Sequence, residues 1–337
     1  MVKFKAEKNL KRKFLAIAAI AVSLLLFKGC YLLEQTIGQL DLRLNQVALD
    51  EAIRTEKDSR IKRLLGEVER IKKFGEDRLN LKSSENYSGY YRTEKQGITF
   101  VVTASAKTEL VPYTWWFPVV GHVPYKGFFD KEDALALERE LQEEGYDTWV
   151  FAAPTYSSLG WFRDPITTPM LRKGIYGLAN AIFHEMTHAT LYVDNQTDFN
   201  ERLAVFVGHR GAMEYLRSGN REPEFFRRIE KQRKRAARLA ATTQKTYRLL
   251  QDLYEKRYPS ERTQLEKGRL FGLLTEEILL LFPDTDPSRW QYNNARLLQS
   301  ARYRPESPVV AGLWQKGGGD WQKFWQSVRQ YTERQGW

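Results

Sequence analysis

Two histidines and a glutamate stand together near the middle of the chain, in the run His184-Glu185-Met186-Thr187-His188. On an α-helix each residue advances by about 100°, so residues four apart share a face and both imidazoles can reach one ion. Glu185 is one position round the helix from His184 and can act on a water molecule bound to that ion. This H-E-x-x-H pattern predicts zinc-assisted hydrolysis, with two imidazole ligands and a carboxylate base.

A catalytic zinc ion takes a third protein ligand and leaves its fourth position to water. Glu201 is the candidate, because it stands in DFNERLAVFVGHRGAMEYL, which predicts a second helix after a short loop. Another interpretation stays open, since Asp198 and Glu201 have the spacing of a capping box, in which Glu201 would bond the backbone at the helix start. The alternative third ligands are then Asp194, Asp198, His209 and Glu214.

The helix that must position the two histidines is predicted to begin after Pro169 and to run to about Tyr192. Its apolar residues cover most of its circumference, which is typical of a buried helix. Three ionisable groups in such a helix need partners, and a metal ion with its water supplies them. The alternative is that both histidines are ordinary core residues satisfied by hydrogen bonds.

Two strands and an aromatic loop are expected near this helix. The strands are predicted at Ile98–Ala106 and Thr148–Pro154, with a helix at Lys131–Glu144 between them. In zinc peptidases with this motif an edge strand commonly holds the substrate backbone, so one of the two strands is the candidate. The stretch Thr114–Phe129 is aromatic and broken by prolines and glycines, and it forms either a substrate wall or a small core of its own.

Three further residues are candidates for contact with a substrate. Tyr156 and Trp161 stand in the loop TYSSLGWFRDP ahead of the motif helix, where they can bind substrate side chains. Zinc peptidases also need a donor that stabilises the tetrahedral oxyanion, and Tyr303 is the candidate for that catalytic role.

Helical regions flank this central part of the chain. Apolar residues at three-and-four spacing predict helices from Tyr31 to about Leu81. A basic, mostly solvated helix is expected at Phe225–Arg248 and a buried one at Leu270–Phe282. The fold class is therefore α+β and mainly helical, with a small sheet beside the motif helix. The expected domains are a leader at residues 1–30, a helical region at 31–82, the core at 83–220 and a second helical region at 221–337.

The leader is typical of an exported protein. A basic head precedes an apolar run at Phe14–Phe27, which has the length of a signal-peptide core rather than of a membrane span. Gly29-Cys30 resembles the end of a lipoprotein lipobox, so Cys30 is the predicted lipidation site. An uncleaved anchor lengthened by Leu32 and Leu33 is the alternative. Either way the N-terminus tethers the protein to a membrane on the periplasmic side of a bacterial envelope, because the positive head stays inside.

The composition of the chain excludes some kinds of metal site and argues against one kind of partner. Cys30 is the single cysteine, which excludes an intramolecular disulfide and a zinc site built from several thiolates. The formal net charge is +11, and much of it falls in the leader. The remaining excess is mild for so long a chain, so we expect no nucleic-acid partner.

Several segments, taken in order, resemble the putative aminopeptidase family of Gram-negative bacterial envelope proteins: WWFPVVGHVPYKGFF, TYSSLGWFRDP, FHEMTH, DFNERLA and NNARL. That family contains zinc-dependent peptidases of the glutamate-ligand type. The resemblance implies a zincin-like core in which His184, His188 and Glu201 hold one Zn²⁺ ion. It also implies that Glu185 is the catalytic base and that the substrate is a peptide or protein. The alternatives are a membrane-tethered, non-catalytic metal-binding scaffold and an envelope endopeptidase.

Overall fold

The computed structural model describes residues 31, 34–83, 85–117, 121–153, 164–219, 221–302 and 307–337. Contacts divide the chain into two compact units, residues 1–46 and 47–337. In the first unit, residues 34–44 are helical. The predicted leader, with Cys30, lies outside the described residues. Across the part that the structure describes, no helix combines the length and the apolar character that crossing a membrane requires.

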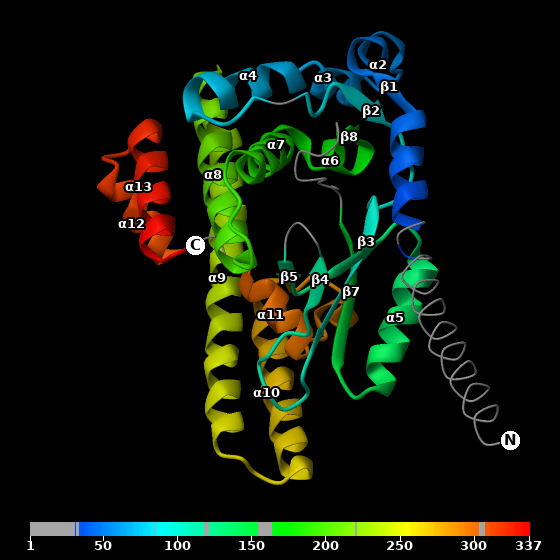
Figure 1. Ribbon diagram of the computed structural model, residues 1–337, viewed down its shortest axis with the longest axis vertical. Helices are drawn as coiled ribbons and strands as arrows, with labels where there is room; N and C mark the ends of the chain where they lie inside the picture. The colour runs from blue at the N-terminus through cyan, green and yellow to red at the C-terminus, as the bar shows by residue number, and fades with distance from the viewer. Residues whose placement is uncertain are drawn as a thin grey trace, which may run out of the picture. The chain divides into compact units, whose positions relative to one another are not determined.

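Helices make up most of the second unit and small sheets complete it, so the fold is α+β and mainly helical, as predicted (Figure 1). Three short helices, α2 (Leu49–Thr55), α3 (Ser59–Leu65) and α4 (Val68–Leu79), form its N-terminal part. The others are α5 (Lys131–Glu143), α6 (Thr168–Arg172), α7 (Gly174–Thr190), α8 (Thr197–Ser218), α9 (Pro223–Glu255), α10 (Ser260–Leu281), α11 (Asn294–Arg302), α12 (Pro308–Lys316) and α13 (Trp321–Arg334), with a 3-10 turn at Pro287–Trp290.

The strands form three small sheets. In the first, the order is β6 (Lys126–Phe128), β3 (Thr99–Ser105) and β7 (Asp147–Ala153), all antiparallel. The second has the order β1 (Gln46–Ala48), β2 (Gly89–Tyr91) and β8 (Ile166–Thr167), and β4 (Trp115–Phe117) pairs with β5 (Gly121–Val123) in the third. The two strands predicted from the sequence are therefore β3 and β7, and the aromatic stretch forms short strands rather than a helix.

β3 is the middle strand of its sheet, and both of its edges are already paired. Val101 lies opposite Gly127 on one side and opposite Phe151 on the other. Past the end of β6, Tyr113 N donates to Ala104 O at 2.9 Å. A substrate backbone cannot be added to β3, so the candidate strand at Ile98–Ala106 is wrong for that role. β7, at the edge of the sheet, is the candidate that remains.

The motif helix begins later than predicted. Pro169 belongs to the short helix α6, and the chain turns at Lys173 before α7 starts at Gly174. Gly174 has a φ of 72°, a left-handed conformation that glycine adopts at little cost. The single helix predicted from Pro169 to Tyr192 is therefore two helices, and α7 ends at Thr190.

α7 is buried, as its apolar circumference predicts. Leu178, Ile182 and Phe183 are fully buried in a cluster that also takes in side chains of α4, α8, α12 and α13. Trp325 Nε1 donates to Leu79 O at 2.8 Å, which ties α13 to the end of α4. Because each large buried side chain contributes about 1.5–3 kcal/mol, helices from both ends of this unit hold the motif helix in place.

Helices α9, α10 and α11 share a second apolar cluster. α9 and α10 lie side by side as a hairpin (Figure 1). Leu274 and Ile278 of α10 are buried, whereas Leu273 and Leu280 are exposed. The prediction of a buried helix at Leu270–Phe282 is therefore wrong for one face, because α10 packs against its neighbours on one side only.

Candidate metal centre

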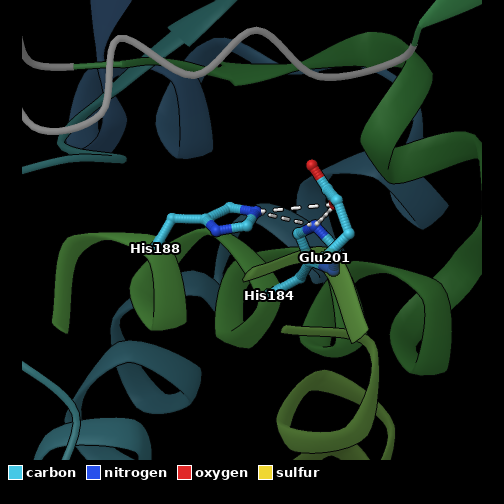
Figure 2. A group of neighbouring side chains, drawn as sticks. All are labelled: His184, His188 and Glu201. Carbon is cyan, nitrogen blue, oxygen red and sulfur yellow. Dashed lines mark hydrogen bonds and ion pairs between the residues drawn. The ribbon is translucent and has the colours of Figure 1, made fainter. Parts of the chain in front are cut away.

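Three side chains from two neighbouring helices converge on one point (Figure 2). His184 and His188 project from α7, and Glu201 projects from the N-terminal part of α8. His184 Nε2 lies 3.2 Å from His188 Nε2 and 3.2 Å from Glu201 Oε2, and His188 Nε2 lies 3.7 Å from the same oxygen. Within the described ranges, this is the one group of histidine, cysteine or acidic side chains close enough to share an ion.

The spacing of these atoms fits a metal ion. A tetrahedral zinc ion with bonds of about 2.0–2.1 Å keeps its ligand atoms about 3.3–3.4 Å apart. The three separations, between 3.2 and 3.7 Å, bracket that value. Glu201 Oε2 is buried within ion-pair distance of both imidazoles but makes no hydrogen bond of good geometry. A cation at this point would give that oxygen the partner that a buried carboxylate needs.

The site is sheltered from water and its carboxylate is ionised. His188 is 7% exposed and Glu201 is 5% exposed. Burial acts to raise the pKa of Glu201, but the two neighbouring imidazoles outweigh it and hold that pKa far below its usual value. Burial acts to lower the pKa of His188, but direct contact with the Glu201 carboxylate, together with the charges of Glu201 and Glu185, more than compensates, so this pKa is raised. An ionised carboxylate is the form that binds a metal.

Glu201 does not close a capping box. α8 begins at Thr197, Gln196 precedes it, and no side chain caps its first turn. Asp198 instead accepts a hydrogen bond from Arg302 Nε at 2.8 Å. The alternative in which Glu201 bonds the helix start is therefore wrong, and its carboxylate turns toward the histidines.

A buried asparagine closes the turn between α7 and α8. Asn200, almost fully buried, accepts from Val193 N at 3.0 Å and donates to Val193 O at 2.7 Å. Because Asn200 directly precedes Glu201, these two hydrogen bonds hold the start of α8 at a set distance from the end of α7. The sequence gives only a weak signal for this role, an asparagine beside the candidate ligand.

Gly208 lets α8 approach α7 closely behind the histidines. A Cβ atom at this position would lie 2.8 Å from Asn180 O and 3.3 Å from His184 Cβ. The backbone oxygen cannot turn aside as a flexible side chain can, so a larger residue would push the helices apart. Gly208 lies about two turns from Glu201 along α8, so such a displacement would reach the ligand.

Glu185 stands beside the three ligand candidates with an unpartnered oxygen. Its Oε2 atom is buried and has no hydrogen-bond partner in the part of the chain that the structure describes. Burial raises the pKa of the Tyr87 and Tyr125 phenols well above the usual value, and the charge of Glu185 adds to the effect on both. A buried carboxylate oxygen with no partner, next to a candidate metal site, is what a base acting on water requires.

The aromatic stretch reaches the centre through the hairpin β4–β5. His122 N donates to Asn195 Oδ1 at 2.9 Å, which ties β5 to the loop between α7 and α8. Gly121, with a φ of 70°, is required beside it, since a Cβ atom there would lie 2.1 Å from the same oxygen. This contact brings the following residues, Tyr125 among them, toward the metal centre.

Tyr125 and Tyr192 are neighbours of the centre that the sequence does not single out. The ring of Tyr192 packs edge-on against that of His188, with centroids 6.1 Å apart. His188 Nδ1 has no hydrogen-bond partner in the described ranges, so this packing orients the imidazole. Burial first, and then the charge of Glu201, raise the pKa of both phenols, so both hydroxyls are protonated at neutral pH. The sequence shows that this stretch is aromatic, but it does not show which of its rings points toward the metal centre.

The alternative third ligands lie outside the cluster. His209 Nδ1 is hydrogen-bonded to the Tyr176 hydroxyl at 2.6 Å. Glu214 forms an ion pair with an arginine of its own helix, and Asp194 and Asp198 are exposed. Glu201 is thus the carboxylate that the structure brings to the histidines.

Three other candidates cannot be placed relative to the centre. Tyr156 and Trp161, predicted to bind substrate, lie outside the described residues. Tyr303, predicted to stabilise the oxyanion, also lies outside them. Their roles stay predictions.

Comparison with known proteins agrees with a peptidase. The chain matches the family model described as putative aminopeptidase over residues 30–336. Because the match covers nearly the whole chain, the protein belongs to the putative aminopeptidase family, and the family inferred from the ordered segments is confirmed. No curated protein and no solved structure matches the chain.

Proposed function

We propose that the protein is a zinc-dependent aminopeptidase that hydrolyses peptide bonds at the bacterial cell envelope. The observation that carries the proposal is the triangle of His184 Nε2, His188 Nε2 and Glu201 Oε2, with Glu185 beside it on α7. Membership of the putative aminopeptidase family supports peptide-bond hydrolysis. Zinc is inferred from the donor set, since two imidazoles and one carboxylate are a common ligand set of catalytic zinc.

Four side chains have defined roles in the proposed reaction. His184, His188 and Glu201 hold one Zn²⁺ ion. When bound, the ion would polarise a peptide carbonyl and lower the pKa of a water molecule toward neutrality. Glu185 takes the proton from that water and returns it to the leaving amine. Burial favours both transfers, because electrostatic interactions are stronger where water is excluded.

A phenol near the centre is proposed to donate the hydrogen bond that the developing oxyanion needs. Tyr125 is the first candidate, because the charges of Glu201 and Glu185 act on its phenol and its raised pKa keeps the proton in place. Tyr192, packed on His188, is the second. Tyr303 remains the candidate from the sequence.

The peptide substrate is proposed to lie along β7. An edge strand offers unpaired backbone groups that an extended peptide can use. In β7 one backbone oxygen, that of Thr148, already accepts a hydrogen bond from Asn293 Nδ2 at 2.7 Å, so the peptide is proposed to lie along the part of the strand after Thr148. β7 also leads directly into the loop TYSSLGWFRDP. That connection supports Tyr156 and Trp161 as contacts for substrate side chains.

The location is proposed from the leader alone. A basic head, an apolar run and Gly29-Cys30 support export and lipidation of Cys30. Labelling cells with a radioactive fatty acid tests this proposal. The wild type should take up label and Cys30→Ala should not, whereas an unlabelled wild type would favour the uncleaved anchor.

The metal content of the purified chain tests the centre. The wild type should hold about one zinc ion per chain, and Glu201→Ala should lose most of it. Glu185→Gln is the matched control, because it changes a neighbouring glutamate that is not a proposed ligand, and it should keep the metal. Full occupancy in Glu201→Ala would remove Glu201 from the ligand set.

Peptides with free and blocked N-termini test the reaction. An aminopeptidase should cleave only the free peptides, and cleavage of blocked peptides would identify an endopeptidase instead. Stoichiometric zinc without hydrolysis of either set would favour a metal-binding scaffold.

A further inference from the structure

Helix α9 carries a dense stripe of cations on one face. Between Arg227 and Arg238 the chain has seven lysines or arginines and one acid, Glu230. At about 100° per residue, six of the seven fall within an arc of about 120°. Arg233 is the exception. It lies on the opposite side of α9 with Ile229, which is buried, so that opposite side is the one that packs. The six residues of the stripe are Arg227, Arg228, Lys231, Lys234, Arg235 and Arg238.

Most of this stripe has no counter-charge. All six side chains are exposed, and Arg227 pairs with Glu224 at 2.6 Å. In the part of the chain that the structure describes, no carboxylate forms an ion pair with the other five. The stripe is therefore a free cationic surface about 16 Å long along the helix axis.

The arrangement costs the helix stability. Arg227 and Lys231, Lys231 and Arg235, and Lys234 and Arg238 are like charges four residues apart. Each such pair destabilises a helix by a few tenths of a kcal/mol. The packing of α9 does not require these side chains, because they point away from the core. An anionic surface laid against the stripe would relieve the repulsion.

Exposed leucines continue the same surface. Lys245 of α9 pairs with Glu277 of α10 at 2.6 Å, which sets the two antiparallel helices in register. Leu249 of α9 lies one turn beyond Lys245, and Leu273 of α10 lies one turn before Glu277, so both are on the side of that ion pair. Leu249 is 41% exposed and Leu273 is 44% exposed. Leu280, less than one turn from Glu277 in the other direction along α10, is 83% exposed.

We propose that this face, the cationic stripe of α9 with Leu249, Leu273 and Leu280, binds the surface of an anionic phospholipid bilayer. The cations meet the phosphate headgroups, and the leucines enter the boundary between headgroups and acyl chains. Nucleic acid would satisfy the cations, but it offers no apolar phase to the leucines. This inference is independent of the peptidase proposal and of the leader.

Vesicle binding by the full-length chain tests the proposal. The chain is sedimented with vesicles of phosphatidylcholine alone and with vesicles that contain about one-third phosphatidylglycerol. Neutral vesicles report what the apolar N-terminal run contributes. Its basic head also favours anionic lipid, but it is the same in the wild type and in every variant. The anionic lipid should strengthen wild-type binding, and R228Q/K231Q/K234Q/R235Q should reduce this gain at least about tenfold. L249Q/L273Q/L280Q should weaken binding to the anionic vesicles as well.

A control variant that loses the same number of charges elsewhere distinguishes an effect of this face from an effect of net charge. K316Q/K323Q/R329Q/R334Q removes four exposed cations from α12 and α13, and it should bind as the wild type does. Equal losses in the two quadruple variants, or none in the α9 variant, would overturn the proposal. So would tighter binding of the wild type to duplex DNA than to anionic vesicles at the same ionic strength. Circular dichroism and zinc content of each variant establish that it is folded.

Discussion

The Oε2 atom of Glu201 lies 3.2 Å from the Nε2 atom of His184, and the two residues come from different helices, α8 and α7. The proposed metal centre is therefore a product of helix packing as much as of the motif. Two features set that packing: the hydrogen bonds of Asn200 to Val193 and the close approach of the helices at Gly208. Substitution of residues that are not themselves ligands should then change metal affinity.

Gly208→Ala should weaken metal binding without unfolding the protein. The added methyl group would lie 2.8 Å from Asn180 O and would displace α8, and Glu201 with it. We expect a fall of about tenfold to a hundredfold in zinc affinity, the range seen when groups that orient ligands are changed. Competition with a chromophoric chelator measures it.

Gly268→Ala is the matched control for that substitution. Gly268 is an exposed residue inside α10, and a Cβ atom there would meet nothing within 4 Å. The change should leave zinc affinity unaltered and stabilise the helix by about 0.5–1 kcal/mol. Equal zinc affinity in both variants and the wild type would show that Gly208 does not position Glu201.

Glu185→Gln should remove most of the peptide hydrolysis and leave metal binding unchanged. Glutamine keeps the size of the side chain but cannot take a proton, so peptide hydrolysis should fall by about 10²–10⁴-fold. Zinc content and the thermal midpoint should stay at wild-type values, because Glu185 is not a ligand and its Oε2 atom has no hydrogen bond to lose. Activity close to that of the wild type would assign the base elsewhere.

Tyr125→Phe should lower kcat more than KM. Removing one donor to an oxyanion typically costs about 10²–10³ in kcat. Tyr192→Phe and Tyr303→Phe serve as comparisons, since each also removes a single hydroxyl. If Tyr192→Phe or Tyr303→Phe shows the large loss instead, the donor is that residue and not Tyr125.

The sequence predicts the parts of this fold that depend on local pattern. The period of the apolar residues places α8, and strand-forming residues place β3 and β7 within one residue of their ends. The break at Gly174 is less visible, because α6 and α7 together have the apolar pattern of one continuous helix. Exposure of Leu280 is not predictable either, since it depends on which face of α10 finds a neighbour.

The candidate site likewise has parts that the sequence predicts and parts that it does not. Spacing within one helix places His184 and His188 together, because four residues make about one turn. The choice between ligand and cap for Glu201 needs the path of the loop, which Asn200 determines from outside the motif. Tyr125 follows a hairpin that is distant in the sequence and is tied to the site by a hydrogen bond between His122 and Asn195, and no spacing in the sequence reports that contact.

His209 makes stability depend on pH independently of the metal. Burial, and then the charges of Arg233, Arg210 and Arg217, lower the pKa of His209 to about 4. Its Nδ1 atom lies 2.6 Å from the Tyr176 hydroxyl, and only the neutral ring can accept a hydrogen bond there. In the unfolded chain the pKa returns to about 6.5. Between these values the unfolded state binds a proton that the folded state does not, so stability is complete above pH 6.5 and falls toward pH 4.

The free energy of unfolding is expected to fall by about 1–2 kcal/mol from pH 6.5 to pH 4. This is less than the whole change in the pKa of His209 would give, because the ring is partly exposed. Urea unfolding of the metal-free protein at several pH values measures it. His209→Gln removes the titrating group while keeping a polar side chain, so its unfolding free energy should depend less on pH by that amount, whatever constant offset the substitution adds. Parallel pH profiles for the two proteins would mean that His209 takes up its proton as readily in the folded chain as in the unfolded one. In that case burial and the charges of the three arginines would not hold the ring neutral in the folded chain.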